Sequence, residues 1–264
     1  MALKQEILLL KGLDHPNIVK YIYTDTSRDK QGVDILLEYM PGGSVRSLLD
    51  NFGAFDELII KTFIKQMLEG LKYLHSKGII HRDLKCANVL VDDNLTIKLT
   101  DFGASKRVSF SDTSKNTEDT TNELSKSLKG SPYWMAPEVV LRTGHNKSAD
   151  IWSLGCVLIE MRTGHPPWHS VSNNAMIVLK TIAATKTGPP IPIDKFSIEA
   201  RNFLNRCLKI NPLHRSTADE LLSDKFIVDN NVKTSEEKIK LMKSQLKNYE
   251  VEVSSHKTTQ HDKS

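Results

Sequence analysis

The chain has 264 residues, a formal net charge of +4 and 39% hydrophobic residues. This length and composition are sufficient for one large domain with a hydrophobic core, and they exclude a chain that is disordered throughout. The weak charge and three scattered cysteines give no indication of a nucleic-acid-binding surface, a disulfide framework or a zinc site.

The first forty residues predict a helix followed by two strands. Apolar residues recur at helical spacing over residues 3–13, and Pro16 lies just beyond the expected end of this helix. Residues 18–23 and 33–39 are expected to form strands joined by a polar turn. The Pro-Gly-Gly sequence at residues 41–43 then predicts a bend.

The middle of the chain predicts a long helix, small strands and a loop. Residues 58–76 have one apolar face, and Gly78 lies where a helix C-terminal cap is expected. A short helix at 45–51 is expected to precede it. Three short apolar segments are expected strands, namely 79–80, 89–91 and 97–99. Residues 105–131 are rich in serine and threonine, which predicts a loop.

Helical patterns dominate after Pro137. Four helices are expected, at about 149–162, 172–184, 197–209 and 217–223. The sequence from Thr217 to Glu220 fits a capping box at the start of the last one. Beyond Val228 the chain is polar and rich in lysine. We expect a solvated tail there, with a partner-binding helix at 234–250 as the alternative.

Three short motifs indicate the chemistry. Residues 81–88 read His-Arg-Asp-Leu-Lys-Cys-Ala-Asn, residues 101–103 read Asp-Phe-Gly, and residues 136–138 read Ala-Pro-Glu. Each motif alone is weak evidence. In this order and at this spacing they resemble the protein-kinase signature set. The long apolar helix before the first motif, and the hydroxyl-rich loop between the last two, fit the same resemblance.

The resemblance implies roles for four residues in phosphoryl transfer from ATP. This reaction depends on positioning and on charge neutralisation more than on covalent catalysis. Asp83 would accept or orient the proton of the substrate hydroxyl, and Lys85 would offset the charge of the transferred phosphate. Asn88 and Asp101 would hold Mg2+, because oxygen ligands suit this cation. Lys85 also resembles the serine/threonine-kinase form of the loop.

Further positions match the nucleotide site of the family. Glu6 lies where the family has the glutamate of its small-lobe helix. Glu38 and Met40 lie at the hinge whose backbone binds adenine. Ser44 and Leu90 are also expected to contact the nucleotide.

The resemblance also implies structural and regulatory residues. Asp150 would accept hydrogen bonds from the backbone of residues 81–82, and Glu138 would form a buried ion pair with Arg215. Arg82 would bind a phosphorylated loop residue. The candidate phosphorylation or substrate-loop positions are hydroxyl residues, with solubilising loop residues as the alternative: Thr120, Thr121, Ser125, Ser127 and Ser131.

The subgroup that the chain resembles most is the MAP kinase kinase kinases. Residues 38–45 (Glu-Tyr-Met-Pro-Gly-Gly-Ser-Val), 101–106 and 130–140 carry this resemblance. It implies a serine/threonine kinase that phosphorylates a MAP kinase kinase, with an upstream activator or scaffold as a further partner. The expected fold is α+β and bilobal. Its expected divisions are a small-lobe remnant at 1–40, a complete and mainly helical large lobe at 41–227, and a tail at 228–264.

The start of the chain departs from the family pattern. No Gly-x-Gly-x-x-Gly segment and no strand lysine lie upstream of Glu6. The expected small lobe is therefore incomplete, with one helix and two strands. We expect an N-terminally truncated active kinase, and the alternative is a short pseudokinase or scaffold without transferase activity.

Targeting signals are not evident in the sequence. No apolar run approaches the ~20 residues of a membrane span. The N-terminus has no signal-peptide profile, because charged residues interrupt its apolar residues. The expected location is the cytoplasm, without a membrane span and without nucleic acid as a partner.

Overall fold

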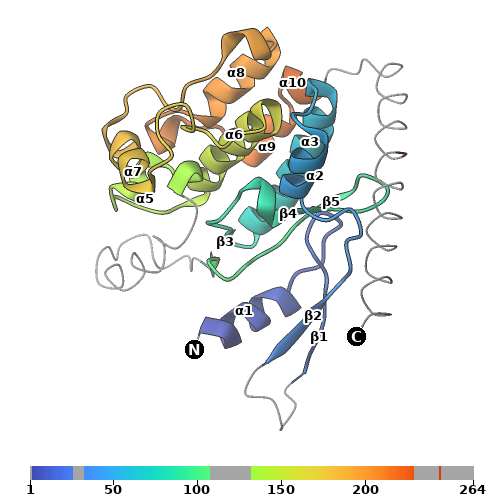
Figure 1. Ribbon diagram of the computed structural model, residues 1–264. Coiled ribbons are helices and arrows are strands. Elements are labelled where there is room, and N and C mark those ends of the chain that lie inside the picture. Colours follow the sequence, from blue (N-terminus) through green and yellow to red (C-terminus); the bar gives the residue numbers. More distant parts are fainter. Residues whose placement is uncertain (1, 26–32, 108–131, 229–243, 245–264) are drawn as a thin grey trace, which may run out of the picture.

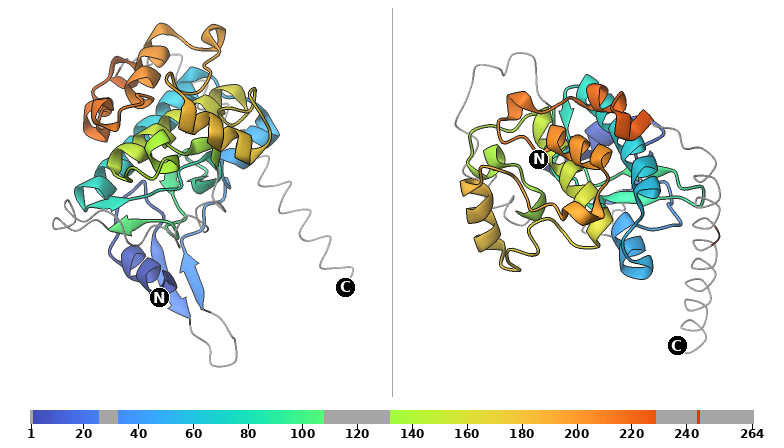
Figure 2. Two further views of the ribbon diagram at one scale, coloured as in Figure 1. Left: turned by 90° about the vertical axis from the view of Figure 1, so that its left-hand side faces the viewer. Right: turned by 90° about the horizontal axis from the view of Figure 1, so that it is seen from above.

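The computed structural model describes residues 2–25, 33–107, 132–228 and 244. A small unit of one helix and a two-stranded sheet lies beside a larger, mainly helical body (Figure 1). Seen from the side, the hairpin projects away from the larger body and lies beside the first helix (Figure 2). Short strands lie between the two parts, and this is the region that carries the sequence motifs.

The small unit consists of α1 (Ala2–Lys11), β1 (Tyr21–Asp25) and β2 (Asp34–Leu37). The strands are antiparallel, with Tyr21 opposite Leu37 and a register irregularity after Tyr21. The sequence predicted that the first strand starts at residue 18, but it starts at Tyr21. The residues just before it pair with another segment instead of with β2. The Val19 N–H donates to the Leu99 carbonyl at 3.0 Å, so this stretch ties the small unit to the larger body.

Helices α2 (Val45–Phe52) and α3 (Glu57–Ser76) follow the bend after β2. Ser44 caps α2 through a reciprocal pair of hydrogen bonds with Ser47. The apolar face predicted for α3 is fully buried. Its C-cap is Lys77, and Gly78 follows with a φ of 70°, a left-handed conformation that glycine adopts without steric penalty.

Helix α6 (Lys147–Thr163) is the centre of the larger body. All thirteen residues from Ala149 to Met161 are buried, so the helix has no solvent-facing side over this length. Short helical segments surround it: η3 (Pro132–Trp134), α5 (Pro137–Val140), α7 (Ala175–Ala184), η4 (Ile193–Lys195), α8 (Ile198–Cys207), η5 (Pro212–His214), α9 (Ala218–Leu222) and α10 (Lys225–Val228). The predicted capping box at Thr217 is present. The helix predicted from residue 172 starts instead at Ala175, because the Asn174 side chain caps it.

Two more antiparallel pairs connect the parts. β4 (Val89–Val91) pairs with β5 (Ile97–Leu99), and η1 (Cys86–Asn88) comes directly before β4. β3 (Ile79–Ile80) pairs with β6 (Lys106–Arg107). The prediction of a loop over residues 105–131 is therefore wrong at residues 106 and 107, because this two-residue strand pairs with a distant segment. None of the helices among the described residues is long and apolar enough to cross a membrane.

Candidate active site

A buried carboxylate on α6 fixes the loop that follows β3. Asp150 Oδ2 accepts a hydrogen bond from the backbone N–H of His81, and Oδ1 accepts one from that of Arg82, both at 2.9 Å. The two bonds predicted from the sequence are therefore present. Arg82 has a φ of 72°, and these bonds help to hold its strained backbone.

Asp150 also contacts His75 Nε2 at 2.9 Å. Burial alone would raise the pKa of the Asp150 carboxyl. The hydrogen bond and electrostatic attraction of His75, followed by His81 and the Arg82 N–H, outweigh burial and lower the pKa below its ordinary value. The carboxylate is therefore ionised and rigidly held under the loop.

Asp83, Lys85 and Asn88 converge at the open side of this loop. Asp83 Oδ2 accepts from Lys85 Nζ at 2.8 Å and from Asn88 Nδ2 at 3.0 Å. The Asn88 amide also donates to the Asp83 carbonyl at 2.8 Å. No hydrogen bond from the described residues reaches Asp83 Oδ1. One carboxylate oxygen is thus anchored by two donors, while the other has no hydrogen-bond partner among the described residues.

His81 is packed beneath these groups. Its Nε2 lies 3.0 Å from the Thr100 carbonyl, and its Nδ1 lies 3.4 Å from the Asp83 N–H. A carbonyl can only accept, so Nε2 carries the proton and Nδ1 is the acceptor. Burial lowers the pKa of His81 despite the nearby carboxylates, of which Asp150 contributes most. The ring also contacts Phe102, with centroids 5.1 Å apart.

Asp101 follows Thr100, whose backbone is hydrogen-bonded to that of Asn88. Thr100 N–H donates to the Asn88 carbonyl at 3.1 Å, so the backbone carrying Asp101 is tied to that carrying Asn88. Asp101 is exposed and has a φ of 64°. Within the described residues its carboxylate forms no hydrogen bond or ion pair. The structure therefore brings the backbones of the two predicted metal ligands together, without a contact between their side chains.

The donor set fits Mg2+. Since both hydrogen-bond donors of Asn88 are directed at Asp83, its amide oxygen remains available, as does the Asp101 carboxylate. No cluster of three or more His, Cys, Asp or Glu side chains with metal-site geometry occurs in the described part of the chain. Mg2+ in nucleotide sites requires no such cluster, because one or two protein oxygens act together with substrate phosphates.

Three of the predicted nucleotide-binding residues, Glu38, Met40 and Ser44, lie on the segment between β2 and α2, and Leu90 lies on β4. Ser44 forms a bridge with Leu90, and Met40 is buried. The Glu38 carboxylate lies 2.7 Å from Lys98 Nζ and accepts from the Lys20 N–H at 2.6 Å. Both contacts involve Oε1 of the carboxylate, and the Glu38 N–H donates to the Lys20 carbonyl, so of the two backbone groups of Glu38 the carbonyl remains for a nucleotide.

A glycine keeps this segment close to β4. A Cβ on Gly42 would lie 2.8 Å from the Val91 carbonyl oxygen, which is too close for any other residue without a backbone shift. Glu6 lies on α1, and its side chain is outside the described part of the structure.

The ion pair predicted between Glu138 and Arg215 is present. The guanidinium contacts both carboxylate oxygens, at 2.5 and 2.7 Å, and both residues are buried. Arg82 follows the buried His81 at the start of the loop. The predicted loop positions fall outside the described residues: Thr120, Thr121, Ser125, Ser127 and Ser131.

Sequence reasoning missed one polar cluster near the site. Glu160 lies on α6 with 1% of its surface exposed, and it contacts Arg46, Trp134 and Cys86. The available signal was a lone acidic residue ending an otherwise apolar stretch of helix. Its three partners come from distant parts of the chain, and no local pattern links them.

Comparison with known proteins identifies the family. The protein kinase domain matches residues 1–227, and the chain belongs to this family. The kinase-like α+β fold predicted from the sequence is thereby confirmed, with a helical large lobe and few strands.

The curated relatives that the chain matches include several MAP kinase kinase kinases. The chain is 51% identical over 225 residues to mitogen-activated protein kinase kinase kinase 2 of Arabidopsis thaliana, covering 85% of this chain and 33% of that protein. It is 50% identical over 226 residues to mitogen-activated protein kinase kinase kinase ANP1 of the same organism, covering 86% and 32%. Identity to mitogen-activated protein kinase kinase kinase A of Dictyostelium discoideum is 46% over 229 residues, covering 87% and 23%. The chain thus spans a third or less of the length of these relatives.

Proposed function

We propose that this site transfers the γ-phosphoryl group of ATP to serine or threonine hydroxyls of a protein substrate. The observation that carries the proposal is the Asp83 carboxylate, with one oxygen held by Lys85 and Asn88 and the other open. This arrangement suits a group that orients a hydroxyl and accepts its proton.

The roles of the neighbouring residues follow from their contacts. Lys85 lies beside Asp83 and would offset negative charge on the phosphate. Asn88 and Asp101 would hold Mg2+, which neutralises phosphate charge when bound. Met40, Ser44, Leu90 and the Glu38 carbonyl would form the adenine and ribose side of the site.

The substrate that we propose is a MAP kinase kinase, acting in a MAP kinase cascade in the cytoplasm. The names of the curated relatives support this choice. We also propose the division into a small-lobe part at 1–40, a large lobe at 41–227 and a tail at 228–264. The boundary at 227 coincides with the end of the kinase match.

The test is transfer of labelled γ-phosphate from Mg-ATP to a MAP kinase kinase whose own active site is inactivated. Both this chain and a form preceded by the glycine-rich loop and lysine-bearing strands of a relative are assayed. We expect label on serine or threonine, and about 10²–10⁴-fold less with Asp83→Asn.

Asp93→Asn, in the turn between β4 and β5, is the matched control and should retain transfer. Nucleotide binding with no transfer in either form would contradict the proposal and favour a scaffold. Transfer that survives Asp83→Asn would contradict the role of Asp83.

A further inference from the structure

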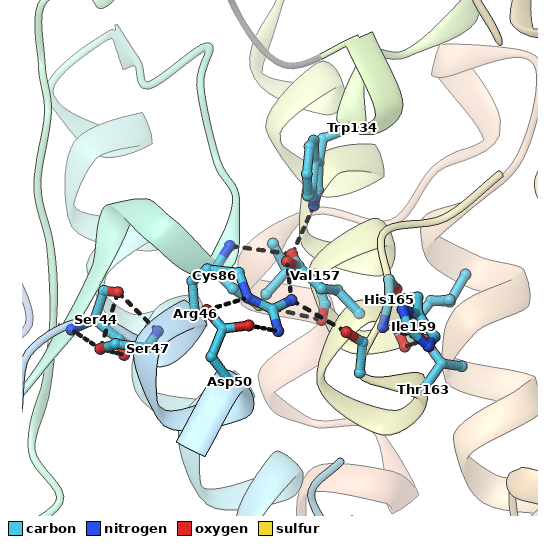
Figure 3. Close-up of polar contacts among 12 residues, drawn as sticks. Ser44, Arg46, Ser47, Asp50, Cys86, Trp134, Val157, Ile159, Thr163 and His165 are labelled. Atoms are coloured by element: carbon cyan, nitrogen blue, oxygen red, sulfur yellow. Dashed lines mark hydrogen bonds and ion pairs between the residues drawn. The ribbon is translucent and has the colours of Figure 1, made fainter. Parts of the chain in front are cut away.

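The buried Glu160 carboxylate accepts hydrogen bonds from three residues that are distant in the sequence. Oε1 accepts from Arg46 Nη1 at 3.1 Å, while Oε2 accepts from Trp134 Nε1 at 2.9 Å and from the Cys86 backbone N–H at 3.2 Å. In Figure 3 the Arg46 side chain and the Trp134 indole extend toward the same place from opposite sides. A charge that is 99% shielded from water requires such partners.

Each donor belongs to a different part of the proposed active site. Cys86 directly follows Lys85 and begins η1, which ends at Asn88. Trp134 ends η3, and its carbonyl also accepts from Ser153 Oγ of α6 at 2.9 Å. Arg46 lies on α2, two residues after Ser44. One carboxylate therefore joins the loop with Asp83, the segment leading to Glu138 and the helix next to the nucleotide edge.

Arg46 is held independently of this carboxylate. It donates to the Gly164 carbonyl at 3.2 Å, and it forms a two-pronged ion pair with Asp50. Its position would therefore persist without Glu160. Cys86 Sγ also lies 4.0 Å from the Val157 carbonyl. The Cys86 N–H and the Trp134 indole N–H, however, have no second acceptor within the described residues, so Glu160 supplies the hydrogen-bond partner that both require when buried.

We propose that Glu160 is a positioning residue for phosphoryl transfer, which fixes the Asp83 loop relative to the segment around Trp134. This inference rests on the proposed function. Glu160 is too buried to touch a substrate, so its effect passes through Cys86 and Trp134. A displacement of about 1 Å at a reacting group can reduce a rate by about 10²-fold, so loss of this link should reduce kcat more than nucleotide affinity.

The first test compares Glu160→Gln with Asp50→Asn. Glutamine has a single acceptor oxygen for three donors, whereas Asp50→Asn alters the other partner of Arg46 and leaves Glu160 intact. We expect Glu160→Gln to lower kcat about 10²-fold while the KM for ATP changes less than about threefold. Hydrogen–deuterium exchange should become faster in peptides covering residues 84–91 and 132–140, and Asp50→Asn should behave like the parent in both respects.

The second test separates positioning from stability. The double variant Arg46→Met/Glu160→Met removes the ion pair as a unit, and such replacements are often neutral or stabilising. We expect a Tm higher than that of the single variant Glu160→Met, because no charge is left buried without its partner, and a kcat that stays low, because Cys86 and Trp134 still lack their acceptor. The proposal is overturned if kcat of the double variant recovers together with its Tm. It is also overturned if folded Glu160→Gln shows an unchanged kcat or unchanged exchange.

If the parent chain transfers no phosphate, that result contradicts the proposed function but does not test the role of Glu160. Hydrogen–deuterium exchange then tests whether Glu160 links the two segments. Faster exchange confined to both peptides in the double variant, measured well below its unfolding transition, then supports the link. Parental exchange at both peptides overturns it.

Discussion

The guanidinium of Arg215 forms a bidentate ion pair with Glu138, which joins α5 to the chain after η5. Arg215 also donates to the carbonyls of Lys209, Ser148 and Ile210, and its guanidinium lies 5.0 Å from the centroid of the Trp152 ring. The pair is thus fully hydrogen-bonded in the interior. This explains how two buried charges are tolerated there.

Removal of one partner should destabilise the chain strongly. Glu138→Ala leaves the Arg215 charge buried without its counter-ion, and we expect the free energy of unfolding to fall by about 3–5 kcal/mol. Urea unfolding followed by circular dichroism measures this loss. Lys72→Ala, which breaks the exposed pair with Asp219, is the control and should leave the midpoint unchanged. A similar midpoint for both variants would contradict the prediction.

Asp150→Asn should destabilise the loop before Asp83. The amide keeps one acceptor oxygen but places N–H donors among the donors of His75, His81 and Arg82. We expect a loss of about 1–3 kcal/mol in the free energy of unfolding. The rate of phosphate transfer should fall even under conditions where the variant is fully folded, because the left-handed backbone of Arg82 loses a supporting hydrogen bond. Transfer assays below the unfolding transition separate these effects, and full transfer there would refute the second one.

His81 should make stability depend on pH. Its pKa in the folded chain lies below the ordinary value of 6.5, so the unfolded chain binds the proton more readily. The stabilising contribution is therefore complete above about pH 6.5 and decreases as the pH falls below it, with a slope of up to about 1.4 kcal/mol per pH unit. Urea unfolding between about pH 7.5 and about pH 5 measures this slope.

The control for this titration is His214, the exposed last residue of η5. His81→Gln should flatten the pH profile, whereas His214→Gln should keep the parental slope. His15, whose pKa burial also lowers, accounts for part of any slope that remains. Equal slopes in His81→Gln and the parent would show that His81 does not cause the pH dependence.

Gly155→Ala should disturb the packing of α6 against α8. A Cβ there would lie 3.0 Å from Cys207 Cβ and from two atoms of Leu208, closer than ordinary contact. We expect a loss of about 1–3 kcal/mol, measured by thermal unfolding. Gly12→Ala is the matched control, since its nearest neighbour would lie at 3.5 Å. A Tm for Gly155→Ala equal to that of the parent would mean that α8 shifts without penalty.

Local patterns predicted much of the fold and little of its long-range pairing. The period of apolar residues predicted α3 closely, and motif spacing placed Asp83, Asn88 and Asp101 in one region. β6 was missed because two residues carry no pattern of their own and pair with β3 across the intervening chain. The Arg46–Glu160 contact was missed for the same reason, since 114 residues separate the two.

The complete burial of α6 between Ala149 and Met161 has a consequence for evolution. A helix on the surface offers one side on which sequence can vary freely, but this stretch has none. Its three polar members are moreover bonded to the surrounding body: Asp150 to the backbone of residues 81 and 82, Ser153 to Trp134, and Glu160 to Trp134 and Cys86. Substitutions that change the volume or polarity of a side chain in this stretch should therefore persist in evolution mainly together with a compensating change in the residue that it faces.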